Sequence, residues 1–351
     1  MEVNSKKTNV GLDFAKFIAA LMVVAIHTNV FKDQNFALYE FCSYCVFTFA
    51  VPFFFICSGY LLGTKISHTL DASGYKEVIK KYFFRLLYPY LIWGIWYFIL
   101  SSLIGIIRNN ISPIDSFVYQ FRLWLVSSPG GGLWYIQTIL IILMLLYIDK
   151  KKEHIGMFTV ISLVLSFMPT IIEQFNKESS IIGNIYDFYY RFFLTDLNFV
   201  WWGVFFLIGL CLAIYGKSVM LKVCKYRVQY LVLFYVVYIF TYFIIGKGIV
   251  LHGMKILVSV FFFIAVLDSK LKLDPVISIT FRKMSTLIYF THFTFIYIVQ
   301  IMFKLLGLDY GTHLTLAWLI SSSAVGVYSF VLVVCLPRNP LMRLYERKNT
   351  R

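Results

Sequence analysis

The 351-residue chain is 60% hydrophobic and only 14% charged, a composition that soluble globular domains rarely have. Its net charge of +15 would suit a nucleic-acid-binding protein, but the basic residues lie between apolar runs long enough to cross roughly 30 Å of hydrocarbon. Composition therefore excludes a soluble protein and predicts an all-α, polytopic bundle of about ten transmembrane helices.

Ten apolar segments follow one another along the chain. The fourth is short, and only Gly246 to Gly248 separate the seventh from the eighth. Because the pieces between them are about 25 residues at most, they are too short to bury cores of their own, and a single membrane domain over residues 1–351 is expected. The expected spans are 11–31, 41–62, 84–107, 133–148, 155–172, 198–215, 229–246, 248–267, 285–303 and 314–336.

The distribution of basic residues predicts the orientation, because short cytoplasmic loops retain positive charge. With the N-terminus inside, 23 of the 32 Lys and Arg residues lie on the cytoplasmic side, Arg85 at the inner end of the third span included, and seven in outer loops, while Lys16 and Lys255 lie deeper within spans. Both termini are therefore expected in the cytoplasm. The same bias accounts for the net charge without a nucleic-acid partner, and we expect a multi-pass protein of the bacterial cytoplasmic membrane.

The first span carries three ionisable residues, Asp13, Lys16 and His27. An ionisable group in a membrane helix costs at least a few kcal/mol and usually faces the bundle interior or a cavity. At about 100° per residue, Lys16 and His27 differ by only about 20° around the helix, and Asp13 precedes Lys16 by one turn on the same side. The structural alternative is an Asp13–Lys16 pair at one membrane surface and an interfacial His27 at the other.

Later spans carry further polar or aromatic motifs. Cys42 and Cys45 form a C-x-x-C sequence, but no second pair accompanies them, so neither a metal site nor redox chemistry is expected. The other motifs, in chain order, are Ser58, Gly59 and Tyr60 at the end of the second span, Lys80, Lys81, Arg85 and Pro89 at the start of the third, Trp134 and Tyr135 in the fourth, His252 and Lys255 in the eighth, and His292 in the ninth.

Together with the [RK]-x10-H spacing of Lys16 and His27, this order of motifs resembles the membrane-bound acyltransferase-3 superfamily over nearly the whole chain. The resemblance implies transfer of an acyl group, most often acetyl from cytoplasmic acetyl-CoA, to a hydroxyl of an extracytoplasmic or lipid-linked glycan. Many members carry an R-x-x-R motif before the proline of the third span, whereas this chain has only Arg85 there. A lysine can replace the missing guanidinium as a point charge, but not as a bidentate fork.

The residues of the first span suit this reaction. Acyl transfer to an alcohol needs a base for the hydroxyl proton and a positive or donor group for the developing oxyanion. His27 is the candidate base, because an imidazole can accept a proton at cellular pH. Lys16 would stabilise charge or hold the donor, and Asp13 would orient or neutralise Lys16.

The candidate donor site lies at the predicted cytoplasmic mouth. There Lys80, Lys81 and Arg85 would hold the phosphates of acetyl-CoA, which is expected as a co-substrate, with no permanently bound cofactor. Ser58 is expected to line the pore beside them, because a Ser–Gly pair in a membrane helix is more often a packing contact than a nucleophile.

The acceptor is expected at the outer side. Two outer loops, 108–132 and 173–196, are rich in aromatic residues, which suits the flat faces of a sugar, although an interfacial aromatic belt would have the same composition. The run Gly130 to Gly132 would let the first loop approach the active face. The candidate acceptor-binding or pore-lining residues are Trp134, Tyr135, His292 and Lys255.

The partners expected on this interpretation are an acyl-CoA donor, a glycan or glycolipid acceptor and the lipid bilayer. A second class of function remains open, because intramembrane charges also mark the substrate paths of transporters, and related membrane domains accompany racemases. That alternative is a membrane transporter or amino-acid uptake domain. A third is a polysaccharide-export or succinyl-transfer component.

Overall fold

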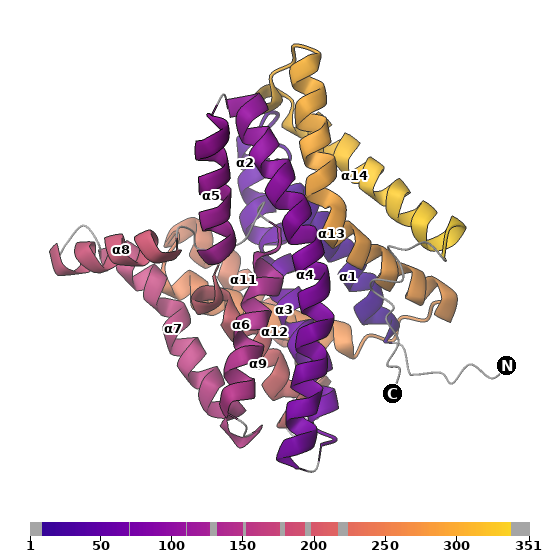
Figure 1. The fold of residues 1–351 in the computed structure, drawn as a ribbon. Coiled ribbons are helices and arrows are strands. Elements are labelled where there is room, and N and C mark those ends of the chain that lie inside the picture. Colours follow the sequence, from indigo (N-terminus) through magenta and orange to yellow (C-terminus); the bar gives the residue numbers. More distant parts are fainter. Residues whose placement is uncertain are drawn as a thin grey trace. The chain divides into compact units, whose positions relative to one another are not determined.

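The computed structural model describes residues 9–69, 71–109, 111–126, 132–149, 152–175, 180–193, 198–216 and 224–337. Every regular element among these residues is a helix (Figure 1). Within the same ranges, eight helices are long and apolar enough to cross a membrane, and two shorter apolar helices coincide with the fourth and sixth expected spans. The predicted helical, polytopic membrane architecture is confirmed, whereas the side on which the termini lie stays a prediction.

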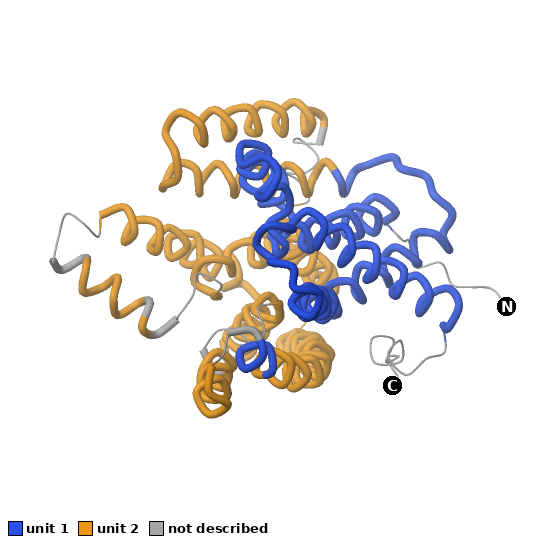
Figure 2. Tube along the Cα trace, turned by 90° about the horizontal axis from the view of Figure 1, so that it is seen from above, with its two compact units in different colours: residues 1–51, 103–110, 266–351 blue, residues 52–102, 111–265 orange. Residues whose placement is uncertain are grey.

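The chain divides into two compact units, which Figure 2 shows in different colours. Unit 1 comprises residues 1–51, 103–110 and 266–351, and unit 2 comprises residues 52–102 and 111–265. Unit 1 therefore combines the first membrane helix with the last two.

Unit 1 contains three long helices, α1 (Val10–Thr28), α13 (Pro275–Leu305) and α14 (Leu314–Phe330). Each packs against the other two, and α13 and α14 lie side by side in Figure 1. Apolar side chains of α13 and α14 are buried where these helices meet. The shorter elements of unit 1 are α2 (Phe36–Glu40), the π-helices η1 (Phe41–Val46) and η6 (Val331–Cys335), and the 3-10 helices η2 (Phe47–Phe49) and η5 (Tyr310–Thr312).

Two asparagines set the ends of α1. The side-chain oxygen of Asn9 accepts a hydrogen bond from the backbone N–H of Leu12 at 3.0 Å, and its amide donates to the carbonyl of Leu267 at 2.8 Å. At the other end Asn29 adopts a left-handed conformation with φ of 51°, which an asparagine tolerates better than most residues. The helix between them is continuous, so the predicted common face of Lys16 and His27 is realised.

Unit 2 holds most of the remaining helices. Within it α7 packs against α8 and α9, and α6 packs against α9. Three of its helices, α3, α4 and α12, extend into unit 1 at one end. The helices are α3 (Ala50–Ile66), α4 (Ala72–Asn109), α5 (Pro113–Val126), α6 (Trp134–Asp149), α7 (Ile155–Phe175), α8 (Ser180–Phe193), α9 (Phe199–Ile214), α11 (Arg227–Ile244) and α12 (Ile249–Leu267), with 3-10 turns η3 (Lys152–His154) and η4 (Cys224–Tyr226).

Glycines bring the backbones of α3 and α9 into contact. A Cβ atom on Gly59 would lie 1.9 Å from the carbonyl oxygen of Phe206, and one on Gly209 would lie 2.1 Å from that of Ile56. No side chain fits at either position, so small residues are required where the two membrane helices cross. The packing interpretation of Gly59 is confirmed.

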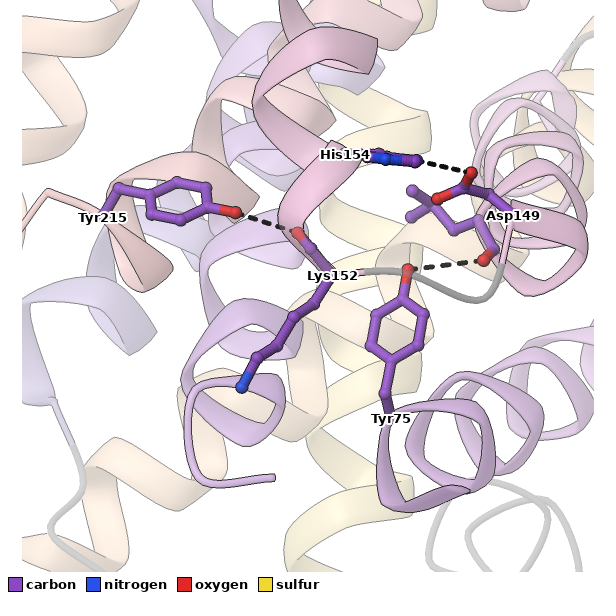
Figure 3. A network of polar contacts seen from close by, with 6 residues as sticks. Tyr75, Asp149, Lys152, His154 and Tyr215 are labelled. Carbon is purple, nitrogen blue, oxygen red and sulfur yellow. Dashed lines mark hydrogen bonds and ion pairs between the residues drawn. The ribbon is translucent and has the colours of Figure 1, made fainter. Parts of the chain in front are cut away.

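A polar network ties the connection between α6 and α7 to neighbouring helices of unit 2 (Figure 3). The Nδ1 atom of His154 lies 2.8 Å from a carboxylate oxygen of Asp149, and the hydroxyl of Tyr215 donates to the carbonyl of Lys152 at 2.8 Å. The hydroxyl of Tyr75 donates to a backbone carbonyl near the end of α6 at 3.3 Å. These bonds fix the start of α4 and the end of α9 against the same turn, on the side predicted to be cytoplasmic.

Two boundaries differ from the sequence-based expectation. The third span was expected over 84–107, but α4 begins at Ala72, after Asp71, whose carboxylate accepts a hydrogen bond from the N–H of Gly74 at 2.9 Å. Hydropathy detects only the apolar part of this helix, and Pro89 therefore lies within it instead of at its start. The seventh and eighth expected spans are separate helices, because Gly246 has a φ of 85° in the connection between them.

The two outer segments expected as loops contain helices. Residues 108–132 include α5 and residues 173–196 include α8, and both helices combine apolar with polar side chains, as is typical of helices at an interface. Gly130 and Gly131 lie outside the described residues, so the expected approach of this glycine run to an active face stays a prediction.

Candidate functional site

The candidate residues fall into two groups, one in each unit. The first group includes the polar stripe of α1, where Asp13 is buried and both Lys16 and His27 are half-buried. Because α1 rises 1.5 Å per residue, Lys16 and His27 are separated by about 16 Å along the helix axis. Their side chains share a face, but they cannot both contact one small reacting group.

His27 meets a second histidine in unit 1. Its ring lies 5.4 Å from the ring of His292 on α13, with an interplanar angle of 26°, and 4.5 Å from the ring of Phe293. The sequence singled out both histidines, and the packing of α1 against α13 brings them together. Among the described residues no hydrogen bond is made to the ring of His27, and its side chain keeps part of its surface exposed.

Backbone contacts fix the tautomer of His292. Its Nδ1 atom lies 3.0 Å from the carbonyl oxygen of Ile288 and 2.7 Å from that of Tyr289. A carbonyl can only accept a hydrogen bond, so Nδ1 carries a proton and, in the neutral ring, Nε2 carries the lone pair. The residue is only 1% exposed, and Nε2 has no partner within the described part of the chain. His292 therefore presents a buried, unused hydrogen-bond acceptor beside His27.

Asp13 has a different partner from the one expected. Its carboxylate accepts a hydrogen bond from the hydroxyl of Ser278 on α13 at 2.8 Å. Across the described ranges it forms no ion pair with Lys16, so the expected neutralising pair is not present. The reason is that α13 supplies a closer donor than the lysine one turn away on the same helix, a neighbour that spacing along α1 could not reveal. Asp13 joins α1 to α13, and Lys16 keeps an ammonium without a carboxylate partner there.

The three basic residues of the candidate donor site lie on α4 in unit 2, and all three are exposed, whereas the fourth residue, Ser58, lies on α3. The guanidinium of Arg85 lies over the ring of Tyr82, 4.4 Å from its centre, a contact that holds the cation without neutralising it. Lys81 pairs with Glu77 at 2.8 Å, but both side chains are more than half exposed, so the pair contributes little to stability. Another anion can therefore take the place of Glu77 beside the Lys81 ammonium. Lys80 lines an apolar groove between α4 and α6.

Ser58 and Tyr135 join α3 to α6 in unit 2. Their hydroxyl oxygens lie 2.6 Å apart, and the Tyr135 hydroxyl also donates to the carbonyl of Phe54 at 3.2 Å. When Tyr135 donates to that carbonyl, Ser58 donates to Tyr135. Both side chains are half-buried, so they can present polar atoms to a ligand. The contact places Ser58, which was expected in the donor site, beside Tyr135, which was expected at the acceptor.

An aromatic cluster connects these hydroxyls to Lys255. The ring of Phe55 lies 4.5 Å from that of Tyr135, and the rings of Trp134 and Trp202 lie 5.2 Å apart. The ammonium of Lys255 on α12 lies 4.8 Å from the centre of the Trp202 ring. The cluster thus brings Trp134, Tyr135 and Lys255 into one part of unit 2.

His252 and Lys255, one turn apart on α12, have separate surroundings. His252 is buried and its Nε2 atom lies 3.2 Å from the hydroxyl of Ser166 on α7. Sequence reasoning missed Ser166, Ser278 and Trp202. An intramembrane serine is too common to signal a partner, whereas the adjacent tryptophans at 201 and 202 were a usable signal, because both rings contact polar side chains of α12.

Comparison with known proteins adds a family and one relative. A sequence model for a family described as an acyltransferase domain matches residues 9–336. Over 251 residues the chain is 31% identical to a protein named amino-acid racemase from Enterococcus faecalis. The alignment covers 69% of this chain and 33% of the relative, so the chain spans about a third of the length of the curated relative that it matches. No solved structure matches the chain.

Proposed function

We propose, because the chain belongs to the acyltransferase-3 family, that it is an integral membrane O-acyltransferase which transfers acetyl from cytoplasmic acetyl-CoA to a hydroxyl of an extracytoplasmic or lipid-linked glycan. The observation that carries this proposal is the pair of His27 and His292. Among the described residues the His27 ring has no hydrogen-bond partner and Nε2 of His292 is a buried acceptor without a partner, so the pair is suited to bind a polyhydroxylated ligand and to deprotonate one of its hydroxyls.

In the proposed reaction the acceptor hydroxyl oxygen forms a bond to the thioester carbonyl carbon of the donor, and its proton passes to His27. The carbon–sulfur bond breaks when the tetrahedral intermediate collapses, and the thiolate of coenzyme A takes the proton back from the imidazolium. We assign Nε2 of His292 to accepting a hydrogen bond from a second, neighbouring hydroxyl of the acceptor, because the reacting hydroxyl gives its single proton to His27. Backbone carbonyls hold the Nδ1 proton of His292, so the orientation of its ring is fixed.

The distance along α1 supports one of the two expected roles of Lys16. A cation about 16 Å from His27 is too far to stabilise an oxyanion formed at the imidazole, so we assign Lys16 to holding the donor. Lys80, Lys81 and Arg85, which are exposed on α4, suit the phosphates of coenzyme A. The absence of a second arginine beside Arg85 favours binding through point charges over a bidentate clamp.

Mass spectrometry of surface glycans from cells with and without the protein tests this function. We expect an ester-linked, alkali-labile acetyl group to disappear with the protein and to return when the gene is restored. Glycans whose acetylation does not depend on the protein would contradict the proposed acceptor, and an altered ester of different mass would replace acetyl with another acyl group.

The relative from Enterococcus favours a second candidate function. Because it is named an amino-acid racemase and its matched segment is about a third of its length, the shared segment could instead handle amino acids at the membrane, as an uptake domain. Uptake of radiolabelled amino acids by proteoliposomes that contain the purified chain distinguishes the two. Accumulation without acyl-CoA would support uptake, and acetyl transfer without accumulation would support the transferase. A polysaccharide-export or succinyl-transfer role remains a third candidate, and succinyl-CoA in the same assay tests the latter.

A further inference from the structure

Lys255 is an intramembrane cation with no carboxylate within ion-pair distance among the residues that the structure describes. It lies on the apolar helix α12, and its ammonium is 4.8 Å from the centre of the Trp202 ring. Across the described residues, neither an ion pair within 4.0 Å nor a hydrogen bond from this ammonium is formed. A charge in such a place is costly and is normally retained for function, and a cation–π contact stabilises it without using its three N–H donors.

We propose that Lys255 forms an anion-binding subsite in unit 2 that takes a carboxylate or phosphate carried by the acceptor. The inference rests on the proposed function, and it names the acceptor class: a hydroxylated ligand with an acidic group. The Trp202 ring holds the ammonium in place, so that the ligand's anionic oxygens accept the unused hydrogen bonds.

The contrast with His252 argues against a purely structural role. His252 is buried one turn away on the same helix, and its Nε2 atom lies 3.2 Å from the Ser166 hydroxyl. A structural polar group in a membrane helix is expected to be satisfied in this way. Lys255 keeps partial exposure and has no such partner among the described residues, which is what a binding group requires before its ligand arrives.

The surroundings of Lys255 suit a sugar-like ligand. Trp202, Tyr135 and Ser58 are half-buried and keep accessible surface, while Phe55 and Trp134 are buried and support them. Aromatic faces beside hydroxyl groups bind hydroxylated rings, and the ammonium would add selection for an acid on that ring.

The expected orientation assigns the subsite to the acceptor and not to the donor. In the orientation predicted from the basic residues, α6, α9 and α12 all begin at the outer side. Trp134 and Trp202 lie near the first residues of α6 and α9 and contact each other, which agrees with a common side for the two helix starts. Lys80 of α4 shares a groove with Tyr147 and Ile148 at the other end of α6, which is the predicted inner side, and there it suits the donor phosphates.

The test compares two acidic ligands with a neutral one on the purified full-length chain. Methyl glucuronide and glucose 1-phosphate carry the two anionic groups, and methyl glucoside carries neither. We expect at least one acidic ligand to raise the melting temperature of the wild type and of Lys255→Arg, and to leave that of Lys255→Met unchanged. Lys247→Met is the matched control, because Lys247 is exposed just before α12 and should preserve the shift.

Acetyl transfer to the same ligands separates this inference from the proposed function. Lys255→Met should raise the KM for the preferred acidic acceptor by about 10-fold to 100-fold and leave the KM for the neutral one unchanged. If acidic ligands raised the melting temperature only when Lys255 was present, but no acetyl was transferred, the proposed transferase function would be wrong and the anion-binding subsite would stand. Three results would overturn the subsite. They are acetyl transfer at the same rate to acidic and neutral ligands, shifts of the melting temperature that do not depend on Lys255, and a Lys255→Met variant whose kcat falls while its KM values equal those of the wild type.

Discussion

Spacing along α1 leaves two explanations for Lys16 open, an interfacial lysine that pairs with Asp13 and a lysine that binds the donor, and the contacts of Asp13 bear on both. The interfacial explanation required a pair with Asp13, but the Asp13 carboxylate accepts its hydrogen bond from Ser278. A carboxylate that is bonded to α13 does not need Lys16 as a partner. Within the described part of the chain Lys16 has no carboxylate partner, which supports the proposal that its ammonium binds an anionic part of the donor.

We expect Lys16→Arg to retain substantial transfer activity and Lys16→Met to lose about 10-fold to 150-fold, because a charge-assisted contact typically contributes about 1.5 to 3 kcal/mol. Initial rates with acetyl-CoA measure this loss. In the double variant Lys16→Met, Asp13→Asn the activity should stay low. Recovery in the double variant would show that Lys16 serves only as a counter-ion for Asp13.

Arg85 is predicted to act on the donor. Its guanidinium is exposed and stacked on Tyr82, so Arg85→Ala should raise the KM for acetyl-CoA about 10-fold and leave the KM for the acceptor unchanged. Arg282→Ala is the control, because Arg282 is an exposed arginine of α13 on the predicted cytoplasmic side. An equal effect of both variants would mean that general positive charge, and not Arg85, attracts the donor.

At the scale of the helices, hydropathy predicted the existence of the long membrane segments and left their partners undetermined. The period of an α-helix shows which residues share a face, as for Lys16 and His27, but not which helix that face meets. Ser278 lies 265 positions from Asp13, and no pattern along the chain joins them. The polar start of α4 and the helices α5 and α8 were missed for another reason, since amphipathic segments at a membrane surface do not produce long apolar runs.

The contact between α3 and α9 yields a stability prediction. Gly59→Ala should lower the free energy of unfolding by about 1 to 3 kcal/mol, because its methyl group would overlap the Phe206 carbonyl oxygen. Thermal unfolding of the purified protein measures the change. Gly156→Ala on α7 is the matched control, since nothing lies within 4 Å of its Cβ position, and it should be neutral or stabilising. Equal melting temperatures for the two variants would mean that α3 and α9 do not cross closely at Gly59.

Asp33 links the segment after α1 to the start of α14. Its carboxylate accepts hydrogen bonds from the hydroxyl of Thr315 at 2.5 Å and from its backbone N–H at 3.2 Å. Although partial burial acts in the opposite direction, these bonds hold the pKa of Asp33 below its ordinary value of 3.8. A lowered folded-state pKa stabilises the fold above the unfolded-state pKa, and this contribution is lost as the pH falls through the folded-state pKa.

Asp33→Asn should therefore lower the free energy of unfolding by about 1 kcal/mol at neutral pH. The difference from the wild type should stay constant down to about pH 4 and shrink below it, because the wild-type carboxylate then becomes protonated. Melting temperatures across this range provide the measurement. A difference that persists unchanged at the lowest pH would show that the charge of Asp33 is not what stabilises the junction.

For the whole molecule, composition and motif order predicted the class correctly, since the helical membrane architecture and the acyltransferase-3 family are both shown. Composition could not predict how the helices distribute between two compact units, because that depends on contacts between the two ends of the chain. The first helix packs with the last two, and this closure brings His27 beside His292.

The proposed role of His27 as the base is tested by the rate of acetyl transfer from radiolabelled acetyl-CoA, measured on reconstituted wild type and His27→Ala at equal abundance. Removing a general base typically lowers a rate by about 100-fold to 10,000-fold, and we predict a loss in that range with normal membrane insertion, because His27 is half-buried and its ring contacts are modest. A His27→Ala protein that keeps most of the wild-type rate would contradict the account.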